Sequence, residues 1–192
     1  MRKTIIYSLL LLCCMLIIPY TAEGQIFTAV EVIDVKDAAT PMEFKANNAV
    51  KKISISSKQQ YIEVTKRGKT IRINPTPPPQ ASMYIWVSLS PNGKYILYNV
   101  PLRGTFVCTI KGKVVAELGR LNAPVWYDNN IILGMDDYDD GENFTKSDVV
   151  AVNFRTAQKQ IVSKETIAVY PYPEKPFVHY FSPNKLITIK LK

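Results

Sequence analysis

Residues 88 to 100 read SLSPNGKYILYNV, in which Ser90-Pro91-Asn92-Gly93 separates two short apolar runs. Proline fixes φ at about −65°, and an Asn-Gly pair readily takes the positive φ of a tight hairpin. The stretch therefore predicts a strand, a two-residue turn and a second strand. Similar patterns follow this hairpin along the chain.

Four predicted strands lie between residues 83 and 118, and each is joined to the next by a hairpin. They are 83–89, 94–99, 105–110 and 114–118. Short strands at regular spacing with tight turns are the sequence pattern of one blade of a β-propeller.

A similar pattern begins again at residue 122. Its expected strands are 122–127, 131–135, 147–154 and 158–163, with a long acidic loop at 136–146. Trp86 and Trp126 lie on the strands that precede the two turns. A third, shortened unit covers 167–192, where Ser182-Pro183-Asn184 repeats the letters of Ser90-Pro91-Asn92. The fold class we predict is therefore all-β and propeller-like, with successive four-stranded antiparallel blades in a small or incomplete ring.

The part of the chain before residue 80 shows the strand pattern less clearly. Residues 26–36 predict a strand or a short amphipathic helix, and 37–48 predict a loop. The alternating runs 50–56, 60–65 and 69–73 predict an antiparallel meander. The proline-rich stretch NPTPPPQ, residues 74–80, favours an extended linker over a polyproline ligand. The predicted organisation is a leader at 1–24, an N-terminal β unit at 25–79 and propeller repeats at 80–192.

The first 24 residues have the features of a secretory signal peptide. Arg2 and Lys3 precede the apolar run 5–18, and Ala22-Glu23-Gly24 offers small residues for cleavage before Gln25. An uncleaved anchor and lipidation at Cys13 or Cys14 are the alternatives. The expected localisation is the periplasm or cell envelope, with membrane attachment only through an uncleaved or lipidated leader.

Charge and cysteine content narrow the partner classes. Without Arg2, Lys3 and Glu23 the chain has 22 basic and 15 acidic residues, a net charge of +7. The lysines are dispersed, so we read them as solvated strand edges and not as a nucleic-acid surface. Cys108 is the only cysteine after the leader, lies within an apolar strand, and is expected to be a small buried residue.

No catalytic motif is evident in the sequence. There is no Gly-x-Ser-x-Gly motif, and His179 is the only histidine, so we assign no catalytic, cofactor-binding or metal-binding residue. The acidic group Asp136, Asp137, Asp139 and Asp140 suggests a calcium site or an acidic, solvated hairpin tip that contacts a partner. A set of aromatic residues near the C-terminus suggests a binding patch or packing between sheets: Tyr170, Tyr172, Phe177, Tyr180 and Phe181.

The segment WVSLSPNGKYILYNV resembles the repeat of TolB-like β-propellers, in which Ser-Pro-Asp-Gly-Lys precedes a strand of aliphatic and aromatic residues. APVWYDNNIILGM is similar to a second repeat with an altered turn, and residues 167–192 are similar to a third that lacks the glycine. The resemblance implies an exported propeller that serves as a protein-interaction platform, or the non-catalytic propeller of an exported peptidase.

The sequence thus leads to three hypotheses. The first is a non-enzymatic, exported propeller that binds an envelope or periplasmic protein, without cofactors and without nucleic acid. The second is the non-catalytic propeller portion associated with an exported peptidase or a glycan-active enzyme. The third is a calcium-stabilised surface module. The identity of the partner, the oligomeric state and the closure of the ring are not given by the sequence.

Overall fold

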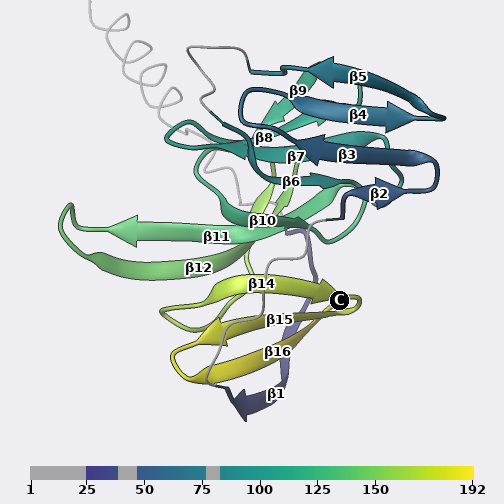
Figure 1. Ribbon diagram of the computed structural model, residues 1–192. Helices are drawn as coiled ribbons and strands as arrows, with labels where there is room; N and C mark the ends of the chain where they lie inside the picture. Colours follow the sequence, from purple (N-terminus) through teal and green to yellow (C-terminus); the bar gives the residue numbers. More distant parts are fainter. Residues whose placement is uncertain (1–24, 39–46, 77–82) are drawn as a thin grey trace, which may run out of the picture.

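The computed structural model describes residues 25–38, 47–76 and 83–192. In these residues the protein is all-β: sixteen strands form four antiparallel sheets of four strands each, without a helix (Figure 1). No helix that could span a membrane is found in the same residues. The prediction of successive four-stranded antiparallel sheets is confirmed. The predicted leader and residues 77–80 of the proline-rich stretch lie outside the described residues.

The first two sheets are built from hairpins that follow one another in sequence. The first sheet contains β2 (Ala49–Val50), β3 (Ile53–Ser57), β4 (Ile62–Lys66) and β5 (Lys69–Ile73). The second contains β6 (Ile85–Leu89), β7 (Tyr95–Val100), β8 (Gly104–Thr109) and β9 (Val114–Glu117). Apolar and polar residues alternate in β3 and β4, so the first sheet buries one face, whereas successive residues of β7 and β8 are buried, so the second sheet buries both faces.

The hairpin at residues 88–100 has a wider turn than predicted. Ser90 N donates to Tyr95 O at 2.9 Å, and Gly93, with φ 69°, donates to Ser90 O at 2.8 Å. The buried Ser90 hydroxyl accepts from Lys94 N at 3.2 Å and from Tyr95 N at 3.0 Å. The two-residue turn was wrong because the serine side chain takes up these backbone donors and stabilises a longer loop.

The third sheet corrects the predicted acidic loop. It contains β10 (Asn122–Trp126), β11 (Ile131–Asp139), β12 (Phe144–Asn153) and β13 (Lys159–Ile161). Residues 136–146 are mostly strand, paired from Asp136↔Asp148 to Asp139↔Phe144, and only the tip is a turn. Figure 1 shows this end of β11 and β12 projecting beyond the other strands. Lysines beside the aspartates offset the repulsion that suggested a loop: Lys146 Nζ lies 2.7 Å from Asp148 Oδ2, and Lys159 pairs with Asp136.

The fourth sheet combines the two ends of the described chain. Its strands are β14 (Val169–Glu174), β15 (Phe177–Ser182), β16 (Lys185–Leu191) and β1 (Val30–Asp37), in the order β1-β16-β15-β14. β1 runs antiparallel to β16, with Val30 opposite Leu191 and Asp37 opposite Lys185. Of the predicted strand at 26–36, residues 30–36 are strand and none is helix, whereas residues 26–29 lead into it without regular structure. Ser182-Pro183-Asn184 is the turn between β15 and β16, so it does not correspond to Ser90-Pro91-Asn92 between β6 and β7.

Three hydrophobic clusters join the sheets in sequence order. The first and second sheets share Ile62, Val64, Leu89 and Ile96 among others. Leu97 and Val107 of the second sheet pack against Trp126, Ile132 and Val150 of the third. The third and fourth sheets share Leu133, Val149, Tyr180 and Ile189, together with Phe27 from before β1. Within the described residues, none of these three clusters joins the fourth sheet to the first.

Candidate functional site

A bulge occurs at the same position in the first strand of the last three sheets. Trp86 in β6 has φ 50°, Ala123 in β10 has φ 42°, and Tyr170 in β14 has φ 55°. At each of these places the pairing register with the next strand shifts. A bulge turns a side chain out of the regular alternation. The correspondence also shows that Trp86 matches Ala123, so Trp86 and Trp126 are not equivalent residues.

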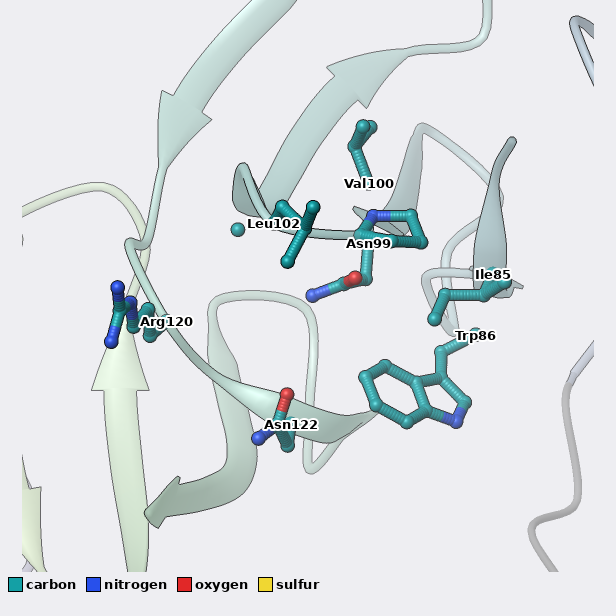
Figure 2. A pocket seen from close by; sticks show the side chains of 9 residues that line it. Ile85, Trp86, Asn99, Val100, Leu102, Arg120 and Asn122 are labelled. Atoms are coloured by element: carbon teal, nitrogen blue, oxygen red, sulfur yellow. The ribbon is translucent and has the colours of Figure 1, made fainter. Parts of the chain in front are cut away.

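A cavity of about 420 Å³ opens beside Trp86, and we call it the Trp86 pocket. Its walls come from the start of β6, the β7–β8 hairpin and the segment leading into β10. Figure 2 shows the Trp86 indole, the carboxamides of Asn99 and Asn122, and the side chains of Leu102 and Arg120 around one space. The remaining lining residues are Ile85, Val100, Pro101 and Gly104. A pocket of this size with an apolar wall and a few polar groups is suited to binding a small ligand or a side chain.

The β7–β8 hairpin can reach this position because residue 104 is glycine. Gly104 has φ 124°, and a Cβ atom there would lie 2.5 Å from Gly119 O. Thr105 N also donates to Gly119 O at 2.8 Å. The hairpin is thus held against the segment that carries Arg120, which fixes two walls of the pocket relative to each other. Leu102, with φ 65°, is fully exposed at the tip.

Both asparagines of the pocket are held by hydrogen bonds on one side. Asn99 Nδ2 donates to Thr105 Oγ1 at 2.9 Å and to Leu121 O at 3.5 Å, and Thr105 Oγ1 donates to Leu121 O at 2.6 Å. Asn122 Nδ2 donates to Asp137 Oδ2, whose other oxygen accepts from Ser147 Oγ at 2.6 Å. Because a carbonyl and a carboxylate only accept, these partners determine which end of each carboxamide is nitrogen.

The paired ends of β11 and β12 from Asp136 to Lys146 form a projecting ribbon that we call the acidic arm. The carboxylates of the arm accept hydrogen bonds from different donors and do not converge on one point. Asp139 Oδ1 accepts from Gly141 N at 3.1 Å, and Asp140 Oδ1 accepts from Glu142 N at 3.0 Å and Asn143 N at 2.7 Å. These backbone donors lower the pKa of Asp140. No group of three histidine, cysteine or acidic side chains among the described residues could hold a metal ion. The geometry therefore gives the calcium hypothesis no support.

The other residues that the sequence singled out have roles in packing or hydrogen bonding within the sheets. His179 is a strand residue in β15, as expected, and its Nδ1 lies 2.8 Å from Thr188 Oγ1. Cys108 is buried in β8, and burial raises the pKa of its thiol to about 12. The C-terminal aromatic residues do not form one patch, because Tyr180 is buried against the third sheet whereas Tyr170 is exposed.

A second cavity, of about 220 Å³, lies at the β15–β16 turn and repeats the geometry of the first. Val169 takes the place of Ile85, and Pro183-Asn184 takes the place of Pro101-Leu102. Asn184 has φ 58°, close to the 65° of Leu102. The smaller cavity lacks the indole and the guanidinium, so the larger one is the stronger candidate for binding.

Sequence reasoning missed the Trp86 pocket. Its residues are spread over residues 85–122, and the segment that resembles a TolB-like repeat contains Trp86 and Asn99 without indicating that they meet Arg120 and Asn122. The one signal in the sequence is Gly104, where the absence of a side chain permits the close approach to Gly119.

Comparisons with known proteins show the fold alone. No protein family model and no curated protein matches the chain. Among solved structures, it is similar to the computationally designed Ika4 protein, with 11% sequence identity and a TM-score of 0.52 over 73% of this chain and 86% of that one. The computationally designed Ika8 protein matches with 12% identity and a TM-score of 0.49, over 72% of this chain and 43% of that one.

Proposed function

We propose that this chain is a non-enzymatic, exported, propeller-like protein that binds another protein of the periplasm or cell envelope. The observation that carries the proposal is the grouping of an indole, a guanidinium and a fully exposed leucine at the Trp86 pocket. Tryptophan and arginine are the residue types that most often dominate the free energy of protein–protein binding. The exposed leucine beside them adds apolar surface whose removal from water by a partner would favour binding.

The propeller-like arrangement is part of this proposal. It is supported by the repeated four-stranded units, by the three clusters that join consecutive sheets, and by β1, which completes the sheet formed by the last three strands. The similarity of the turn at residues 90–93 to TolB-like repeats adds to it. A rigid stack of sheets of this kind would hold the pocket and the acidic arm in fixed positions for a partner.

Residues 25–192 used as bait in envelope extracts would test the proposal. We expect wild type to capture a partner, and Leu102→Asp to lose it, because a carboxylate would have to be desolvated at the contact. Ile33→Asp is the control, since Ile33 is a half-exposed residue at the bulge of β1, in the fourth sheet. Equal capture by Leu102→Asp and wild type, or turnover of a peptide or glycan substrate by the purified protein, would contradict the proposal.

The predicted export can be tested separately. The full chain with a C-terminal tag should appear in the periplasmic or envelope fraction, and its N-terminal sequence should begin at Gln25. A protein that keeps residues 1–24 in the membrane fraction would support the anchor alternative instead.

A further inference from the structure

We propose that the Trp86 pocket binds a short peptide segment in which an apolar or aromatic side chain lies next to an acidic one. This inference rests on the proposed protein-binding function and specifies its ligand. Three kinds of group face the cavity: an apolar wall, two carboxamide oxygens without a donor, and the guanidinium of Arg120.

The apolar wall fits a hydrocarbon side chain. Ile85, Pro101, Trp86 and Leu102 give the cavity its apolar lining, whereas the side chain of Val100 is buried in the cluster shared by the first and second sheets. Aliphatic groups on this scale favour a peptide side chain over a saccharide, because the hydroxyls of a sugar would lose their hydrogen bonds to water against them. The volume of about 420 Å³ is at the lower end of the range for ligand pockets, which suits one side chain with its flanking backbone.

The two carboxamide oxygens fit the N–H groups of a peptide backbone. The nitrogen of each asparagine is already used, by Thr105 and Leu121 for Asn99 and by Asp137 for Asn122. No described residue donates a hydrogen bond to either Oδ1 atom. In Figure 2 both carboxamides border the open space, so their free acceptors can receive donors from a ligand.

Arg120 would select a ligand that carries a negative charge. Its guanidinium lies across the space from Trp86, and it forms no ion pair with any described residue. Asp137, which is linked to the pocket through Asn122, already accepts hydrogen bonds from Asn122 and Ser147. An Arg–carboxylate pair is the strongest common ion pair in recognition, and it can be bidentate. A peptide carboxylate is therefore the expected partner of Arg120.

Selection from a random heptapeptide phage library on residues 25–192 would test the ligand class. We expect enriched sequences with an aromatic or aliphatic residue next to Asp or Glu. A synthetic copy of an enriched peptide should bind wild type and lose affinity ~10-fold or more with Arg120→Gln, as for one charge-assisted hydrogen-bonded pair. Arg103→Gln is the matched control, because it removes the same charge from the β7–β8 hairpin at a residue that does not itself line the pocket.

Leu102→Ser provides a second variant that leaves the fold intact, since the side chain is fully exposed. It should weaken the same peptide several-fold, whereas replacing the acidic residue of the peptide by its amide should abolish the difference between wild type and Arg120→Gln. Selection without an acidic consensus, failure to enrich any peptide, or equal losses with Arg120→Gln and Arg103→Gln would each overturn the inference.

The outcome also separates this inference from the proposed function. If an envelope partner is captured equally well by wild type and Arg120→Gln, protein binding stands and the assignment of an acidic peptide to this pocket is wrong. If peptides bind as expected but no envelope protein is captured, the ligand class stands and the proposed partner does not.

Discussion

The first and fourth sheets have the same number of strands but are assembled from very different parts of the chain. All four strands of the first sheet lie within residues 49–73. The fourth sheet takes three strands from residues 169–191 and its edge strand, β1, from Val30–Asp37. The first sheet needs only the closure of short hairpins, whereas the fourth needs two distant ends of the chain to meet.

The two sheets also differ on the faces that point away from the described clusters. In the first sheet this face carries Ser54, Ser56, Thr65 and Arg72, which are polar. In the fourth it includes Phe177 and Leu186, which are partly buried, beside His179. A polar face suits contact with water, so the first sheet is adapted to end the stack of sheets. One terminal sheet is therefore locally complete, whereas the other depends on long-range pairing.

The largest expected effect comes from removing residues 25–37. Without β1, the pairing edge of β16 and the apolar side chains beneath it are exposed to water. We expect the free energy of unfolding, measured by urea denaturation, to fall by roughly 4 kcal/mol or more. This is the upper end of what single substitutions cause.

A circular permutant provides the control for this deletion. Lys192 N donates to Ala29 O at 3.0 Å, so a short Gly-rich turn can join these two residues with a new N-terminus at Asn47. The permutant makes β1 and β16 a local hairpin and should recover most of the lost stability. A permutant as unstable as the deletion would show that the pairing of β1 is not what stabilises the fourth sheet.

The next effect is a loss of stability at alkaline pH that depends on Cys108. The pKa of this buried thiol is raised from 9.0 to about 12, so it stays neutral in the folded protein while the unfolded chain ionises above pH 9. The folded state then binds the proton more tightly, and stability falls between about pH 9 and 12, by up to ~4 kcal/mol at the upper end. Urea titrations across this range should show a steeper decline for wild type than for Cys108→Ala.

Cys108 lies in the cluster shared by the first and second sheets. The reactivity of its thiol therefore reports whether this end of the protein opens, and not the fourth sheet. A thiol reagent should react slowly with the native protein near neutral pH, and removal of β1 should not accelerate it if the first two sheets hold together alone. Rapid labelling after that deletion would show instead that the sheets open as one unit.

A smaller effect is expected at Gln160, which fastens the segment before β1. Its Oε1 accepts from Ile26 N and Phe27 N, both at 2.7 Å, and its Nε2 donates to Phe27 O at 3.1 Å. Gln160→Ala should cost about 1–3 kcal/mol of unfolding free energy, because backbone groups lose their partners. Gln158→Ala, which removes only an exposed contact with Thr156, is the control. Equal losses for both variants would argue against the role of this contact.

The smallest effect is expected on the polar face of the first sheet. Ser54→Val with Ser56→Val should change the free energy of unfolding by no more than ~0.5 kcal/mol each, since both side chains are exposed. The new apolar patch should instead promote self-association, visible in sedimentation velocity. A large gain in stability without association would indicate that this face packs against the rest of the same chain.

Prediction from sequence succeeded where the structure is local. The runs around Ile53, Ile62 and Ile71 were read correctly as a meander because alternation and turn residues act over a few positions. It failed for the acidic segment, because density of charge suggested a loop while Lys146 and Lys159 offset that charge from positions that only pairing reveals. It also failed for Ser182-Pro183-Asn184. This stretch joins the second and third strands of its sheet, whereas Ser90-Pro91-Asn92 joins the first and second strands of its own.

The sequence by itself determined the all-β class, the order of the hairpins and the burial of Cys108, because alternation and turn chemistry act between near neighbours. The tertiary structure alone decided that β1 completes the fourth sheet and that Trp86, Asn99, Leu102, Arg120 and Asn122 surround one cavity. The physical reason is the same in both cases. Pairing across more than a hundred residues, and the convergence of three separate segments, depend on how the sheets pack against each other and leave no periodic signal in the chain.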